Sequence, residues 1–224
     1  MSRTVCLYLT IISFLVACWV KVPAKGTDHT PLTKALKDSL RNEIEAMLKN
    51  DQKYRWMIQF GETDENKLAE LRKMSEADQF QRMKAVQDDK VGIAKKAKDS
   101  LWQMQAAIDS SNFVKMKGII YTYGYPKKYM EAYKVSVIFI HARPQWMTAD
   151  FFRVLKEEVM NGNMPAFEYA AIYDRMQIEN KLPELYYVSE HYDAKTGKSA
   201  IGKPLNMEAT NKAREEIGLK KWKD

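Results

Sequence analysis

Residues 32–60, with the sequence LTKALKDSLRNEIEAMLKNDQKYRWMIQF, decide the fold class of this chain. Apolar side chains recur there at steps of about four residues, at Leu36, Leu40, Ile44, Met47 and Leu48. Charged residues fill the positions between them, which is typical of an amphipathic helix with one face on a core. Thr33 or Thr30 is expected to cap this helix, and the apolar stripe continues as far as Gly61.

Further helices are expected along most of the chain. The spacing predicts one long helix or two over residues 64–109, where sparse apolar positions between charges resemble a coiled-coil-like hairpin. The polar residues that follow are expected to end that region, with a short helix over 113–123 after them. Residues 135–140 are strand-like by propensity, but no partner strand is visible, so we predict a buried helix over 129–142.

The C-terminal third adds helices and a small β element. Three more helices are predicted, over residues 151–159, 166–180 and 206–217. Residues 185–188 and 200–201 flank a turn signal at 193–197, which indicates a β-hairpin. The expected fold class is mainly α, a multi-helix domain with a long helical hairpin insertion and a small C-terminal β-hairpin.

The N-terminal residues are typical of an export signal. Arg3 supplies a positive charge, and residues 4–20 form an uninterrupted apolar run. That run is shorter than the ~20 residues that a comfortable membrane-spanning helix needs. We therefore predict a signal peptide over residues 1–24 and a single mostly helical domain over 30–224, with 56–110 as a helical insertion within it.

Two ways of processing the signal are open. Leu15-Val16-Ala17-Cys18 resembles the bacterial lipoprotein signal, in which Cys18 becomes the lipidated first residue. Residues 22–24, Val-Pro-Ala, suit ordinary secretory cleavage instead. An uncleaved anchor or a buried helix is the third alternative. The expected location is the periplasm, the outer membrane or the outside of the cell, with a membrane contact only through the possible N-terminal lipid.

Composition excludes several classes of protein. The 36 Lys and Arg residues against 29 Asp and Glu give +7, but Arg3, Lys21 and Lys25 lie in or beside the signal, so the remainder lacks the strong field of a nucleic-acid binder. Both cysteines, Cys6 and Cys18, also lie in the signal, which excludes disulfides, thiolate nucleophiles and cysteine metal sites from the domain. Phosphate loops, zincin motifs and serine hydrolase elbows are absent, and we expect no cofactor and no metal.

Three polar clusters interrupt the apolar faces. They are Asp51-Gln52 with Arg55, then Asp109 with Asn112, then Asp174-Arg175, and His141 follows a separate apolar run. Buried charges are costly unless they are paired, so these groups could form one internal network or line one pocket. The alternative is that they are helix caps, surface ion pairs and a histidine at the edge of the core.

The chain resembles an uncharacterised family of bacterial domains. The resemblance is carried, in order, by Asp51-Gln52-x-x-Arg55, Asp109-x-x-Asn112, Tyr123-Gly124-Tyr125-Pro126, His141, Tyr169-Ala170-x-Ile172-x-Asp174-Arg175, Leu185-Tyr186 and Arg214-x-x-Ile217-Gly218-Leu219. That family is marked by Asp-Gln-x-x-Arg, Tyr-Gly-Trp-Pro, Gln-His, Tyr-Ala-x-Leu-x-Asp-Arg and Gln-x-Tyr-Gly-Thr-Gln. Here Tyr125 replaces the Trp, Ile140 stands before His141 where Gln is common, and residues 184–189 replace the last motif. The resemblance implies an architecture and candidate positions, without a known reaction.

Two functions of different classes follow as expectations. The first is an exported, lipid-anchored cell-envelope domain that binds an envelope protein or a small ligand. The second is an enzyme with a polar pocket for a small anionic or glycan substrate, in which a histidine or carboxylate is the general base and arginines hold the anion. The catalytic candidates are His141, Asp174 and Asp51, and the ligand-binding candidates are Gln52, Arg55, Arg175 and Tyr186. We expect the enzyme only if His141 lies near Asp51 or Asp174.

Overall fold

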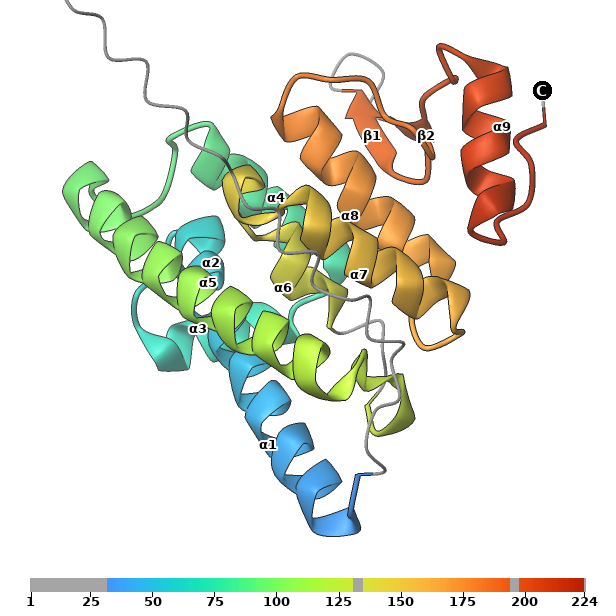
Figure 1. Ribbon diagram of the computed structural model, residues 1–224. Helices are drawn as coiled ribbons and strands as arrows, with labels where there is room; N and C mark the ends of the chain where they lie inside the picture. Colours follow the sequence, from blue (N-terminus) through green and yellow to red (C-terminus); the bar gives the residue numbers. More distant parts are fainter. Residues whose placement is uncertain (1–31, 131–134, 194–197, 224) are drawn as a thin grey trace, which may run out of the picture.

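The computed structural model describes residues 32–130, 135–193 and 198–223, and within these the chain is mainly helical, as predicted (Figure 1). The expected signal, including Cys18, lies outside the described residues. In chain order the elements are α1 (Lys34–Asp51), α2 (Lys53–Phe60), α3 (Glu65–Lys73), α4 (Glu76–Gln87), α5 (Lys95–Tyr123), η1 (Pro126–Lys128), α6 (Ser136–Ile140), η3 (Pro144–Trp146), α7 (Ala149–Met160), α8 (Ala166–Glu179), β1 (Glu190–Asp193), β2 (Lys198–Ile201) and α9 (Met207–Glu216). None of the helices in these ranges is long and apolar enough to cross a bilayer.

Helix α1 forms where the apolar stripe predicts it. The Thr33 hydroxyl accepts a hydrogen bond from the backbone N–H of Leu36 and caps the helix, and Leu40, Ile44 and Met47 are buried. Gln52 separates α1 from α2, so the two helices follow each other with a break of one residue. This break matters for the site, because Asp51 is the last residue of α1 and its side chain is buried.

The long helix of the predicted hairpin region, α5, pairs with α1 and α2. Asn112 of α5 hydrogen-bonds the carbonyl oxygen of Met47, and Gln105 hydrogen-bonds that of Asp51, so the helices run antiparallel (Figure 1). The two arms of the helical hairpin are therefore α1–α2 and α5, and residues 56–110 supply only part of it. Whether those residues are an insertion stays a prediction.

The predicted break between residues 109 and 113 is wrong. Asp109 and Asn112 lie inside α5, which is 29 residues long and runs without a break from Lys95 to Tyr123. Residues such as Asp, Ser and Asn favour turns because their side chains compete with the backbone for hydrogen bonds. Here the buried side chains of Asp109 and Asn112 bond to α1 and α2 instead, and the tertiary contacts override the local preference.

Helices α3 and α4 build a small second core on α2. Met57, Ile58 and Phe60 of α2 pack with Leu68 of α3 and Leu101 of α5. The segment turns sharply after α2 at Gly61, whose φ is +62°. A Cβ atom there would lie 2.6 Å from the Cα atom of Gly92, so only glycine fits both the backbone angle and the space.

The main core is assembled around the short helix α6. Val135 and Ile138 are buried and residues 136–140 are helical, which confirms a buried helix in place of a strand. The predicted span of 129–142 is too long, because α6 has only five residues and residues 131–134 lie outside the described ranges. Phe139 of α6 lies between Phe113 of α5 and Phe151 of α7, with ring centroids 6.2 and 5.5 Å away. Helices α7 and α8 then cover α6 on the side away from α1 (Figure 1).

Near the C-terminus, β1 and β2 pair antiparallel, with Glu190 opposite Ile201. The first arm expected at residues 185–188 is wrong, because those residues form a loop before β1, and most of the turn expected at 193–197 lies outside the described residues. Helix α9 ends next to Gly218, close to the predicted boundary, and that glycine has a φ of +80°.

Candidate functional site

Most of the predicted polar residues meet in one buried cluster between α1, α2, α5 and α6. We use the name polar network for Asp51, Gln52, Arg55, Gln105, Asp109 and His141. Asp51 ends α1, while His141 follows the last turn of α6, so residues 90 positions apart in the sequence come into contact. The break at Gln52 places the side chains from α1 and α2 opposite α5.

Arg55 and Asp109 form the paired half of this network. The guanidinium donates two hydrogen bonds to the carboxylate, of 3.2 and 2.8 Å, and both side chains are about one-tenth exposed. Gln105 donates to the same carboxylate at 2.8 Å and to the carbonyl oxygen of Asp51 at 2.9 Å. Burial raises the pKa of the Asp109 carboxyl, although the Gln105 hydrogen bond and the charge of Arg55 oppose the shift. Arg55 is therefore occupied by an internal carboxylate and is not placed as a clamp for an external anion.

Asp51 and His141 form the other half. The Nδ1 atom of His141 lies 2.9 Å from the Oδ2 atom of Asp51, and the amide of Gln52 donates to the same oxygen at 2.6 Å. The Asp51 side chain is 1% exposed and that of His141 is 23% exposed. The second oxygen of Asp51, Oδ1, is buried without a hydrogen-bond partner. The pair thus joins a fully buried carboxylate to an imidazole that reaches the surface.

The direction of this hydrogen bond follows from the chemistry of its two groups. An ionised carboxylate can only accept, and a hydrogen bond to it from His141 requires the proton on Nδ1. In the neutral imidazole the other nitrogen, Nε2, is then a proton acceptor. A buried acid that fixes the tautomer and the orientation of a partly exposed histidine is an arrangement that can remove a proton from a water molecule or a hydroxyl group.

Asp174 belongs to a separate cluster. Its Oδ1 atom accepts the backbone N–H groups of Leu185 and Tyr186, each at 2.9 Å, and its Oδ2 atom accepts that of Val188 at 3.2 Å. The residue is fully buried, and burial raises the pKa of its carboxyl against the effect of these hydrogen bonds. Among the described residues no hydrogen bond or ion pair joins Asp174 to His141, so of the two proposed acid partners the structure brings only Asp51 to the histidine.

The remaining ligand-binding candidates also lie outside the polar network. Arg175 is exposed on α8 and forms an ion pair with Glu179, one turn further on. Tyr186 is buried beside the rings of Tyr169 and Tyr173, and burial raises the pKa of its hydroxyl. Of the predicted ligand-binding residues, Gln52 and Arg55 join the network, whereas Arg175 and Tyr186 do not.

The sequence did not single out several buried polar residues. Gln105 is completely buried at the centre of the polar network, four residues before Asp109 on α5. A second acidic pair surrounds Tyr125, whose N–H donates to Glu158 at 2.9 Å and whose hydroxyl donates to Glu168 at 2.6 Å. Burial raises the pKa of both Glu168 and Tyr125. The i, i+4 spacing could have found Gln105, whereas the residues around Tyr125 share no such pattern.

In the described ranges, no group of three His, Cys, Asp or Glu side chains is placed to hold a metal ion.

Comparison with known proteins gives no match to a family model, to a curated protein or to a solved structure. The resemblance to the uncharacterised bacterial family therefore stays a prediction. The argument for function rests on the geometry of the residues alone.

Proposed function

We propose that this chain is an exported protein of the cell envelope that binds a small polar ligand at His141 and exchanges a proton with it. The observation that supports proton exchange is the 2.9 Å contact between the buried Asp51 carboxylate and the partly exposed His141 imidazole. The free Nε2 atom acts as the base, and Asp51 stabilises the imidazolium that forms. Since no serine, threonine or lysine side chain among the described residues hydrogen-bonds this pair, the group that gives up its proton is a water molecule or a hydroxyl of the ligand.

The arrangement narrows the enzyme class expected from the sequence. Arg55 is held by Asp109, and Arg175 lies outside the polar network, so neither arginine is placed to bind an anionic substrate at His141. A neutral substrate with an exchangeable proton therefore suits the pair better than a phosphate or a carboxylate. Ester and glycosidic bonds are the two classes of bond that we expect such a base to open with water.

The test compares the wild-type chain with two variants of the histidine. His141→Asn keeps an N–H group at the place of Nδ1 and so preserves the bond to Asp51, but it has no basic nitrogen. His141→Gln removes both features. We expect turnover of at least one chromogenic ester or glycoside by the wild type, lowered by about 100-fold or more in both variants. Wild-type turnover that equals that of His141→Asn across the whole panel would overturn the proposal.

A second candidate, binding without chemistry, has its own observation. Apart from the Oδ1 atom of Asp51, no buried side-chain nitrogen or oxygen of the network lacks a hydrogen-bond partner, so the network also suits a structural role that holds α1 and α2 against α5 and α6. In that case His141→Asn, whose amide can still donate to Asp51, lowers the free energy of unfolding by less than about 1 kcal/mol and leaves any turnover unchanged. The same two variants therefore separate a binding domain from an enzyme.

Export is supported by the charge of Arg3, the apolar run at residues 4–20 and Cys18 near the end of that run. We expect the chain to leave the cytoplasm and to incorporate a fatty acid at Cys18. Labelling with a palmitate analogue, followed by cell fractionation, tests this step, and Cys18→Ser is the control that should lose the label. A mature chain that starts at residue 25 would indicate ordinary secretion, and an intact N-terminus in the cytoplasm would contradict export.

A further inference from the structure

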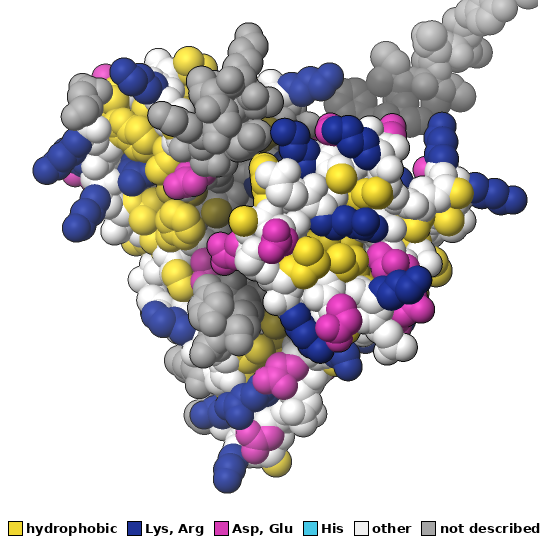
Figure 2. All heavy atoms as spheres, turned by 180° about the vertical axis from the view of Figure 1, so that it is seen from behind, with side chains coloured by type: hydrophobic (Ala, Val, Ile, Leu, Met, Phe, Trp, Pro, Cys, Tyr) yellow, Lys and Arg dark blue, Asp and Glu magenta, His cyan; other side chains and the backbone are white. Residues whose placement is uncertain are grey.

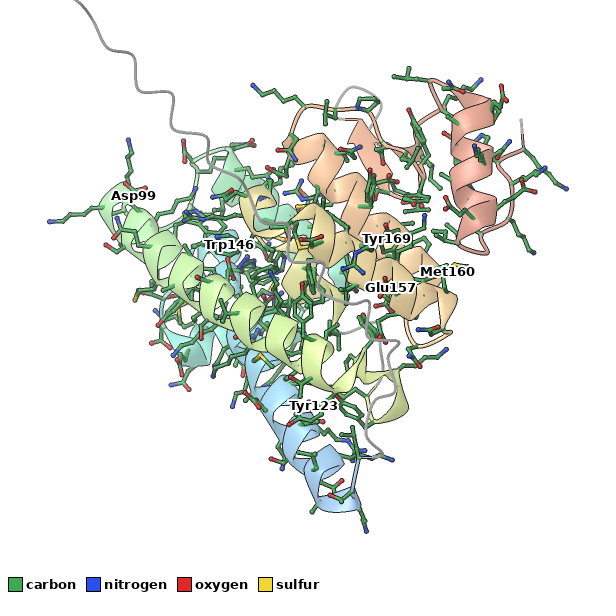
Figure 3. All side chains as sticks on the ribbon, viewed as in Figure 1. Asp99, Tyr123, Trp146, Glu157, Met160 and Tyr169 are labelled. Carbon is green, nitrogen blue, oxygen red and sulfur yellow. The ribbon has the colours of Figure 1, made fainter. Side chains whose placement is uncertain are left out.

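A cleft of about 470 Å³ lies between η3, α7 and α8, away from the polar network. Trp146, Glu157 and Tyr169, labelled in Figure 3, mark the three elements that enclose it. Its volume falls within the range of about 300–1,000 Å³ that is usual for small-molecule sites. None of its lining residues belongs to the polar network, so the cleft needs an explanation of its own.

The floor of the cleft is aromatic and preformed. Phe152 of α7 packs edge-to-face on Tyr173 of α8, with ring centroids 5.1 Å apart, and on Tyr169, 6.3 Å away. Tyr169 lies in turn beside Tyr173 at 6.2 Å. Because each ring is fixed by two others, the surface that they offer to a ligand does not have to form on binding. Phe152 and Tyr173 are only half-buried, so part of each ring remains free to contact a ligand.

The charges at the rim are already neutralised. Arg153 forms an ion pair with Glu157 and Lys156 forms one with Glu216, each with an N–O distance of 2.7 Å. An anionic ligand would have to displace a carboxylate from either cation, and a cationic ligand would meet Arg153 and Lys156 first. Figure 2, the view from behind, shows acidic and basic side chains interspersed on that face of the molecule. The cleft therefore favours an uncharged ligand.

Uncharged polar groups supply the directional contacts. Gln177 lines the cleft half-buried, and its amide makes no hydrogen bond to any part of the chain that the structure describes. The Asn180 amide donates to the carbonyl oxygen of Met176 at 2.9 Å, which leaves its own oxygen as an acceptor. The Tyr173 hydroxyl likewise has no hydrogen-bond partner among the described residues. Donors and acceptors thus stand beside the exposed parts of the Phe152 and Tyr173 rings.

We propose that this cleft binds a neutral saccharide. A sugar ring carries an apolar face of C–H groups, which suits the rings of Phe152 and Tyr173, and a rim of hydroxyls, which suits the amides of Gln177 and Asn180. Planar aromatic ligands share the first feature but lack the hydroxyls that would satisfy both amides. The site is independent of proton transfer at His141, so it holds whether the chain proves to be an enzyme or a binding protein.

The experiment titrates the full-length chain, as the cell processes it, with neutral tetrasaccharides and with one anionic counterpart. Chitotetraose, cellotetraose and maltotetraose are the neutral probes, and tetragalacturonate is the anionic one. Isothermal titration is expected to detect at least one neutral probe with a millimolar or lower Kd. Tyr173→Leu removes the flat ring and Gln177→Leu removes the amide, and each is expected to weaken binding about tenfold.

Gln59→Leu on α2 is the matched control, because Gln59 is an exposed glutamine that does not line the cleft. It is expected to bind the same probe with unchanged affinity. Circular dichroism spectra and melting temperatures of the three variants show whether each one folds. The proposal is overturned if no neutral probe binds, if folded Tyr173→Leu and Gln177→Leu bind like the wild type, or if tetragalacturonate binds more tightly than every neutral probe.

Discussion

Asp51 and Asp174 are both buried carboxylates, but Asp174 is hydrogen-bonded by backbone groups and Asp51 by side chains. Asp174 accepts three backbone N–H groups from one loop, so its two oxygens are used to fix the path of residues 185–188. Asp51 accepts from two side chains, Gln52 and His141, and keeps one oxygen without a partner. A backbone N–H group is fixed by the fold and does not change its protonation state. An imidazole side chain can rotate away and can gain or lose a proton. Both carboxylates are buried, so burial does not distinguish them. Their hydrogen-bond donors do, and they make Asp174 a structural residue and Asp51 a candidate functional one.

The largest effect on the free energy of unfolding is expected from a substitution of Asp174. Asp174→Ala leaves the N–H groups of Leu185, Tyr186 and Val188 without acceptors inside the protein, and we expect a loss of about 4 kcal/mol in the free energy of unfolding. Urea unfolding measures this loss. Arg175→Ala is the control one residue away: its exposed ion pair with Glu179 should contribute no more than about 0.5 kcal/mol. Equal stabilities of the two variants would contradict a clamp at Asp174.

A somewhat smaller effect is expected in the paired half of the polar network. Asp109→Leu leaves the Arg55 guanidinium buried without its carboxylate, and we expect a loss of about 3 kcal/mol. The double variant Arg55→Met with Asp109→Leu removes both charges together, so it should be more stable than Asp109→Leu alone. Chemical unfolding of the two single variants and the double variant gives the coupling energy. A double variant that is less stable than either single one would show that the two residues do not act as a pair.

His141 tests the functional member of the comparison. His141→Leu takes one partner from the buried Asp51 carboxylate, and we expect a loss of about 2 kcal/mol, because Gln52 remains as a donor. His141→Asn should lose less than about 1 kcal/mol, since its amide can still donate to Asp51. Thermal and urea unfolding of both variants measure the difference. If His141→Asn were as unstable as His141→Leu, the hydrogen bond to Asp51 would not be what the histidine contributes to stability.

The sequence predicts the helices of this chain better than it predicts their partners. The stripe at Leu40, Ile44 and Met47 locates α1, because an amphipathic helix has to bury that face wherever its neighbour lies. The same reasoning fails at Asp109, where a polar run typical of a turn continues as helix, since its partner Arg55 lies 54 residues away on α2. Local preference contains no information on contacts at that separation.

The residues of the candidate site were predictable from the sequence, but which of them lie in the same cluster was not. Asp51, Arg55 and His141 stood out because charged or titratable residues beside apolar runs need partners, and the structure places all three in one network. Asp174 stood out for the same reason, yet its partners are backbone N–H groups, which every residue possesses and which no pattern of side chains reveals. Only the fold could separate the two acids.

The smallest expected effect is a dependence of stability on pH, to which Asp174 contributes together with Asp109 and Glu168. Burial raises the pKa of Asp109, Asp174 and Glu168, so each carboxyl holds its proton to a higher pH in the folded chain than in the unfolded chain. The free energy of unfolding should therefore fall as pH rises through these raised values, and it should be greater near pH 5 than at pH 7. Urea unfolding at the two pH values measures the change. Asp174→Asn has no titrating carboxyl at that position, so its dependence should be shallower than that of the wild type; a steeper one would mean that the Asp174 pKa is lowered in the folded chain.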